Sequence, residues 1–284
     1  IIYASLSALA AAVFYYKPYL EDFYSLSKEK VASFESVLSD SVSKPAGKNI
    51  YAPTPLKSEE KSTNTTLTRK GVIEFTNKER SKDGKKTLKE NKELDAAALK
   101  KAKDILAKQY FEHVSPDGNG PDYFVSSAGY DYITIGENLA LGNFSDDQDL
   151  VTAWMASEGH RENILNSKFQ EIGVAVVKGT YEGKSTWVGV QEFGTPADVC
   201  EAADEDLKEK IESNSKKIDK LEDNLKENKS KIEDMSPRDD DYSQAVDDYN
   251  TLVNEYNALV KKTKDLIEEY NDEVKDYNKC IESY

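Results

Sequence analysis

Residues 153–166 read Ala-Trp-Met-Ala-Ser-Glu-Gly-His-Arg-Glu-Asn-Ile-Leu-Asn. Their His160 is one of two histidines in 284 residues. The other, His113, lies in Tyr110–Gly118, which reads YFEHVSPDG, and between the two comes Ile135–Ala140, which reads IGENLA. Since the chain has so few imidazoles, any imidazole chemistry must use these two side chains.

Two further motifs follow, FQEIGV at Phe169–Val174 and VQEFG at Val190–Gly194. The motifs run in unbroken order within residues 70–197, and together they resemble the bacterial branch of the CAP superfamily. That superfamily includes cysteine-rich secretory proteins, antigen 5 and plant pathogenesis-related proteins. The resemblance implies an α-β-α sandwich with a central cleft, in a secreted or surface-exposed protein.

The resemblance also implies that His113, Glu137 and His160 line the cleft. Two neutral imidazoles and a carboxylate suit a zinc site with an open coordination position. We therefore expect Zn²⁺ or another divalent cation on these three residues, with Glu158 as a further ligand. Such a metal either binds only or activates water, with Glu137 as ligand or catalytic general base. The His-Glu-x-x-His spacing of zinc peptidases is absent.

Each motif also fits a purely structural role. His113 suits the carbonyls at a helix C-terminus, Glu137 and Asn138 suit a helix cap, and His160 suits a hydrogen-bonded core position. A serine nucleophile beside either histidine is a further alternative, but no nucleophile-elbow motif supports it. The presence of both histidines in family motifs favours a shared cleft.

The residues around these motifs predict helices first and strands afterwards. Apolar residues recur on one helical face from Leu94 to Tyr110. Ile172–Lys178 and Ser185–Phe193 are β-branched runs on either side of a Glu-Gly turn, which is typical of a hairpin. This order predicts an α+β layered domain over residues 70–197.

Residues 200–284 carry a seven-residue repeat. Tyrosine recurs at one heptad position from Tyr242 to Tyr284, with aliphatic residues three and four positions later. The segment Leu207–Met235 repeats the period, and Ser236–Pro237 interrupts it. The pattern predicts an acidic, antiparallel helical coiled-coil hairpin, for which self-association is an expected property.

The hairpin makes a prediction about the two cysteines. If Met235 lies opposite Tyr242, the antiparallel register brings Cys200 within one helical turn of Cys280. A disulfide there would close a long loop, would add about 4 kcal/mol by the loop-entropy model, and would indicate an oxidising compartment. The alternative is two buried free thiols.

The N-terminal residues are apolar from Ile1 to Tyr16, a run shorter than the roughly 20 residues that span a bilayer. We interpret residues 1–20 as a truncated transmembrane or signal-anchor segment, with a cleaved signal peptide and a buried core helix as alternatives. Residues 21–69 are expected to form a helical or disordered linker, because Ser, Thr, Pro and Lys dominate its second half.

The formal net charge is −15, which argues against nucleic acid as a partner because phosphate binding needs a basic surface. The sequence predicts an extracytoplasmic protein, secreted or anchored through its N-terminus to a membrane. Its predicted role is a non-enzymatic binding or effector module for a surface protein, an envelope component or a lipid. The alternatives are a metal-dependent hydrolase acting on peptide or envelope material, and a coiled-coil interaction stalk with the CAP-like domain as scaffold.

Overall fold

The structure is a computed structural model that describes residues 49–61 and 65–284. The expected membrane or signal segment, residues 1–20, and the expected linker up to residue 48 lie outside the described residues. Within the described ranges, no helix is both long enough and apolar enough to cross a bilayer.

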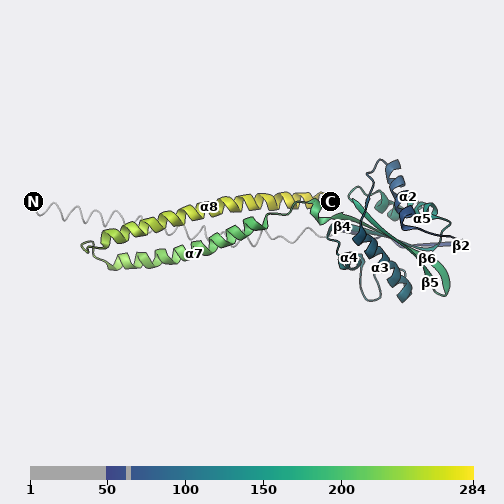
Figure 1. Cartoon of the computed structure of the whole chain (residues 1–284), viewed down its shortest axis with the longest axis horizontal. Coiled ribbons are helices and arrows are strands. Elements are labelled where there is room, and N and C mark those ends of the chain that lie inside the picture. Colours follow the sequence, from purple (N-terminus) through teal and green to yellow (C-terminus); the bar gives the residue numbers. More distant parts are fainter. Residues whose placement is uncertain (1–48, 62–64) are drawn as a thin grey trace, which may run out of the picture. The chain divides into compact units, whose positions relative to one another are not determined.

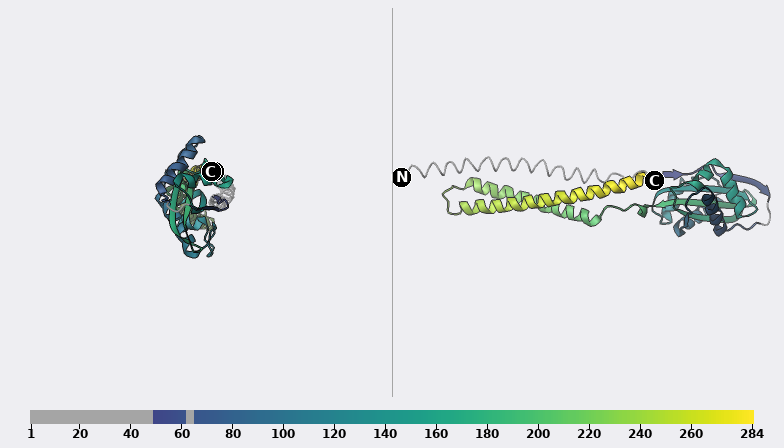
Figure 2. Two further views of the ribbon diagram at one scale, coloured as in Figure 1. Left: turned by 90° about the vertical axis from the view of Figure 1, so that its right-hand side faces the viewer. Right: turned by 90° about the horizontal axis from the view of Figure 1, so that it is seen from above.

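The described chain forms two compact units. Among the described residues, the first comprises 49–61, 65–206 and 275–284, and the second contains Leu207–Val274. Figures 1 and 2 show their secondary structure. Each unit is described by itself below.

The first unit is built on a six-stranded sheet in the order β1-β4-β6-β5-β3, with β2 also pairing with β4. The three long strands β4, β6 and β5 are antiparallel neighbours, whereas β1 and β2 run parallel to β4, and β3 runs parallel to β5. The strands are β1 (Asn49–Tyr51), β2 (Leu56–Lys61), β3 (Lys89–Glu90), β4 (Tyr132–Asn143), β5 (Glu171–Tyr181) and β6 (Lys184–Pro196).

Helices cover both faces of this sheet. On one face, Trp154 and Ile164 join a core that includes Phe193 of β6. On the other face, Ile105 packs with Val190. The two apolar layers confirm the α+β class and the α-β-α sandwich. The helices of this unit are α2 (Arg69–Lys82), α3 (Lys92–Lys108), α4 (Pro121–Ser127), α5 (Asp147–Ala156) and α6 (Glu158–Leu165), followed by a short 3₁₀ helix, η1 (Ala197–Val199).

The second unit contains most of two long helices, α7 (Glu205–Asp234) and α8 (Tyr242–Glu282). Residues 235–241 join them, and both helices contribute to one apolar cluster, in which Ile218 and Leu225 of α7 meet tyrosines of α8. The heptad pattern therefore predicted the helical pair correctly, while supercoiling of the two helices stays a prediction. The buried members of the cluster are Ile218, Leu225, Tyr249 and Tyr256.

The last residues of α8 belong to the first unit. Cys280 forms a disulfide with Cys200, with a Cα–Cα distance of 5.8 Å, which confirms the predicted pair and excludes the free-thiol alternative. Beside the disulfide, Ile281 packs with Ile133 of β4. Nε2 of Gln170 also donates to the hydroxyl of Tyr284 at 3.1 Å, which adds a polar contact beside the disulfide.

Residues 49–61 differ from the expected linker. They form β1 and β2, which pair with β4 at Thr134–Gly136 and at Ala140–Asn143. The composition indicated a linker because half-buried strands with Pro53 and Pro55 between them show no continuous apolar alternation.

Candidate functional site

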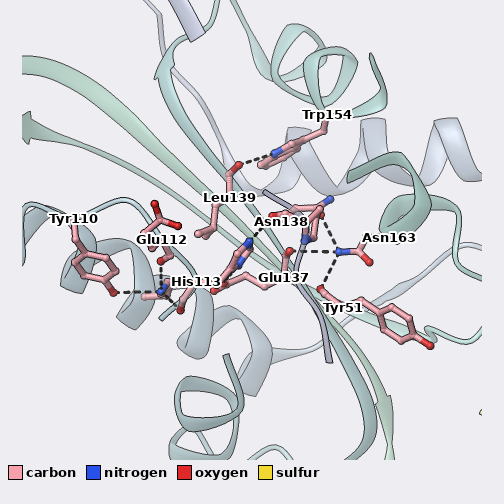
Figure 3. Close-up of polar contacts among 11 residues, drawn as sticks. Tyr51, Tyr110, Glu112, His113, Glu137, Asn138, Leu139, Trp154 and Asn163 are labelled. Carbon is pink, nitrogen blue, oxygen red and sulfur yellow. Dashed lines mark hydrogen bonds and ion pairs between the residues drawn. The ribbon is translucent and has the colours of Figure 1, made fainter. Parts of the chain in front are cut away.

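The predicted cleft residues converge on the middle of β4. Glu137 and Asn138 lie on this strand and are fully buried, and His160 on α6 is 1% exposed. His113 lies beyond the end of α3, in the segment that leads to α4, so it does not hold the carbonyls of that helix C-terminus. Figure 3 shows the polar contacts that join these elements.

His113 uses both ring nitrogens for contacts within the chain. Its Nδ1 lies 2.5 Å from Oε1 of Glu137. Its Nε2 contacts the main-chain oxygen of Pro53, and must donate there because a carbonyl oxygen only accepts. One proton therefore lies between Nδ1 and the carboxyl group, on the imidazole or on Glu137. This arrangement fixes the ring between β4 and the segment that joins β1 to β2.

A buried lysine holds the segment that carries His113. Lys101 lies on the apolar face of α3, and its Nζ donates to the main-chain oxygens of Glu112 at 2.8 Å and of His113 at 2.5 Å. Burial lowers the pKa of Lys101, while the nearby carboxyl groups of Glu137 and Glu192 act in the opposite direction. Lys101 thus holds the backbone that carries His113.

His160 has different hydrogen-bond partners from His113. Its Nδ1 lies 2.8 Å from Oγ of Ser157, and burial lowers the pKa of its imidazole to about 4, with a further contribution from His113. His160 is therefore neutral at physiological pH. The contact joins a serine and a histidine, but Nε2 of His160 has no hydrogen-bond partner in the described part of the chain, so no acid completes a triad.

Side-chain amides tie the motifs together. Nδ2 of Asn163 donates to Oδ1 of Asn138 at 3.0 Å and to the main-chain oxygen of Tyr51 at 3.1 Å. Nδ2 of Asn138 in turn donates to the main-chain oxygen of His160 at 3.2 Å and to Oε1 of Gln191 at 3.1 Å. Asn138 therefore links β4, α6 and β6 and does not cap a helix.

A second carboxyl group lies beside Glu137. Glu192 of β6 is directly opposite Glu137 in the strand register, and both side chains are fully buried. Burial, followed by the charge of Glu137, raises the pKa of Glu192 well above its usual value. Burial and the neighbouring negative charge both disfavour the ionised form of Glu192.

The side chains of His113, Glu137 and His160 match the requirements of a metal site only in part. Oε2 of Glu137 and Nε2 of His160 are buried without a hydrogen-bond partner in the described residues, as open ligand positions would be. Both nitrogens of His113, however, are already engaged. Glu158 is exposed at the start of α6, and within the described chain no group of three or more His, Cys, Asp or Glu side chains is arranged to hold a metal.

Comparison with known proteins agrees with this architecture. Residues 73–193 match the model of the cysteine-rich secretory protein family, named CAP. This part of the chain is a CAP domain. The chain is 39% identical over 154 residues to the uncharacterised protein YkwD of Bacillus subtilis. That match covers 52% of this chain and 57% of YkwD, so the chain spans little more than half of its relative.

Two solved structures are also similar to the CAP domain. An extracellular protein containing an SCP domain from Bacillus anthracis is 28% identical, with a TM-score of 0.38, and the match covers 44% of this chain and 39% of that one. An outer surface protein of Borrelia burgdorferi is 22% identical, with a TM-score of 0.40, and the match covers 45% and 91% of the two chains.

The sequence motifs predicted that His113 and Glu137 lie together, but not the residues that hold them in place. Glu192 stands inside the quoted VQEFG motif, where a carboxyl group among buried strand residues was an available signal. Lys101 was also detectable, because it follows Ala97 and Ala98 on the apolar face of its helix. Pro53 carried no local signal, since its contact with His113 spans 60 positions of sequence.

Proposed function

We propose that this CAP-domain protein is an extracytoplasmic binding module whose cleft, centred on His113 and Glu137, holds a ligand without reacting with it. The proposal rests on the hydrogen bonding of the two ring nitrogens of His113. Its Nδ1 faces Glu137, and its Nε2 donates to a main-chain oxygen, that of Pro53. The histidine therefore acts as a hydrogen-bond donor to peptide, as in a recognition site.

The disulfide supports the extracytoplasmic part of the proposal. Cys200 and Cys280 are the two cysteines of the chain, and they are bonded to one another. Structural disulfides persist in oxidising compartments outside the cytoplasm. The protein is then secreted, or is held at the surface through its N-terminal segment.

A zinc titration by calorimetry tests the binding module against a metal site. The intact chain is compared with the His113→Ala, His160→Ala double variant, which contains no imidazole because the chain has two histidines. We expect the same weak heats from both proteins, since the acidic surface offers both the same carboxylates. Fluorescence of Trp154 and Trp187 checks that the variant is folded. Binding of one equivalent by the intact chain, lost in the variant, would contradict the proposal.

A metal-dependent hydrolase acting on peptide or envelope material is the second candidate. The unpartnered Oε2 of Glu137 and Nε2 of His160 favour it. In this candidate His113 and His160 would hold Zn²⁺ or another divalent cation, Glu137 would be a further ligand or the general base, and the metal would supply Lewis acidity. Its test is turnover of envelope peptides that disappears in Glu137→Gln while metal remains bound. Turnover that is unchanged in this variant would remove Glu137 from the catalytic role.

A further inference from the structure

The segment before the matched CAP region lies extended beside β4 and contacts the site residues. β1 pairs with Thr134–Gly136 of β4, and β2 starts its pairing at Ala140, so the residues between them pass alongside Glu137–Leu139. Tyr51, Pro53 and Pro55 are half-buried, whereas Ala52 and Thr54 are exposed. This alternation is that of an added strand with one face against the domain.

The contacts of this segment fall on the site residues. Tyr51 accepts a hydrogen bond from Nδ2 of Asn163 through its main-chain oxygen, and its ring meets Phe169 edge-on at 5.9 Å. Pro53 accepts from His113. The Gly-His motif contributes too, because a Cβ atom built on Gly159 would lie 2.7 Å from Cβ of Pro53. Two main-chain oxygens and two rings are thus recognised.

Downstream residues extend the contact along β4. Leu56 packs against the core cluster that contains Trp154. The ammonium group of Lys57 lies 5.7 Å from the ring centre of Phe111. A Cβ atom on Gly142 would lie 2.7 Å from the main-chain oxygen of Ser58, so the two backbones approach closely there. The recognised pattern is an aromatic residue, a proline two positions later and an aliphatic residue three positions after that.

The segment pairs with the sheet of this unit but lies outside the part of the chain that matches the family model. The family match begins at residue 73, after the segment has ended. The donors that hold it, on His113 and Asn163, belong to the matched region. Residues 62–68 connect the segment to α2, and such a short tether gives an intramolecular ligand a high effective concentration.

We propose that the CAP cleft is a peptide-binding groove for an extended aromatic-x-Pro-x-x-aliphatic segment of a partner protein, and that residues 49–58 occupy it in cis as a tethered competitor. Recognition is by strand addition to β4, with main-chain hydrogen bonds for affinity and side-chain contacts for specificity. The inference rests on the proposed function, because it names the ligand class of the same cleft. A partner segment enters when the tethered one leaves.

A nicking experiment tests this proposal. Residues 62–64 of the full chain are replaced by a protease site, and the labelled peptide Asn49–Ser58 is titrated against the cut and the uncut protein by fluorescence polarisation. After cutting, the resident segment is no longer tethered and is removed by dilution. We expect the peptide to bind the cut protein at least tenfold more tightly than the uncut protein.

Variants separate recognition from non-specific binding. His113→Ala in the cut protein should weaken peptide binding about fivefold, through loss of one hydrogen bond. A peptide carrying Pro53→Gly should also bind more weakly. Tyr123→Ala, which removes an exposed tyrosine of α4, is the matched control and should leave binding unchanged.

Three results would overturn the proposal. The first is a cut protein that stays folded, by tryptophan fluorescence, and does not bind the peptide. In that case the cleft takes another ligand, and the zinc titration still decides the proposed function. The second is a cut protein that unfolds when the segment leaves, which would make residues 49–58 an integral part of the domain. The third is a dimer of uncut chains that the peptide dissociates, which would assign the groove to a second copy.

Discussion

The CAP domain and the helical hairpin bury different kinds of side chain. The CAP domain places Lys101, Glu137 and Glu192 at zero exposure around one cleft. The hairpin buries aliphatic and tyrosine side chains, and its fully buried polar residue, Thr263, donates its hydroxyl to Leu259 of the same helix. Burying charge costs free energy unless it is compensated.

This difference in buried side chains indicates that the functional site lies in the CAP domain. In the hairpin a regular repeat explains the buried apolar residues through packing, and the buried polar residues, Asn214 and Thr263, carry no charge. In the CAP domain, packing does not explain two carboxyl groups and a lysine beneath a histidine. Buried ionisable groups with shifted pKa values, such as Lys101 and Glu192, are typical of functional sites. The experiments below test this contrast, from the largest expected effect to the smallest.

Removing the disulfide should produce the largest effect. In a Cys200→Ser, Cys280→Ser variant we expect the free energy of unfolding to fall by about 4 kcal/mol, because the bond closes a loop across 80 positions. Circular dichroism follows mainly the long helices, while both tryptophans, Trp154 and Trp187, report on the CAP domain. The closed loop consists mostly of the hairpin, so the helical signal should shift more in denaturant. Equal shifts in both signals would show that the two regions unfold together.

Removing the buried cation should be the next largest effect. Lys101→Met leaves the oxygens of Glu112 and His113 without their donor and removes the charge beside Glu137 and Glu192. We expect a loss of about 3 kcal/mol in the free energy of unfolding.

The matched substitution in the hairpin is Thr263→Val, which should cost less than about 1 kcal/mol because the hydroxyl donates within its own helix. Both values come from urea unfolding. Similar costs for Thr263→Val and Lys101→Met would break the contrast between the two regions.

Crowding the cleft should have a smaller effect. Alanine is favoured over glycine inside a helix by about 1 kcal/mol, but at Gly159 the new methyl group meets Pro53. We expect Gly159→Ala to raise amide hydrogen exchange in residues 49–57 about fivefold, measured by mass spectrometry. Glu162→Ala, an exposed change on the same helix, is the control. Unchanged exchange at residues 49–57 in Gly159→Ala would show that the segment is not held against that helix.

Regular patterns and family motifs were predictable from sequence, and long-range pairings were not. The heptads predicted α7, α8 and the meeting of Cys200 with Cys280, because each depends on a repeat visible along the chain. The motifs predicted that His113 and Glu137 meet. Strand β4 gave no usable signal, because nearly all of its residues are buried and no alternation marks them.

The residues around the cleft were unpredictable for a different reason. Asn49 pairs with Thr134, across 85 positions, and a two-proline segment resembles a linker whenever its partner strand is unknown. Asn163 was part of a quoted motif, yet its bond to Tyr51 depends on the same unexpected strand. The sequence therefore predicted the contact between His113 and Glu137, but not the segment at Pro53 that packs against it.

The disulfide also determines how the protein would carry mechanical tension. Residues 201–204 connect Cys200 to the start of α7. Near the C-terminal end of α8, Cys280 is bonded to Cys200 through the disulfide. A force applied at the turn, residues 235–241, would therefore reach the CAP domain along two covalent paths. α7 and α8 would be stretched side by side, and neither helix could be peeled away alone. The two helices would therefore share the load between them.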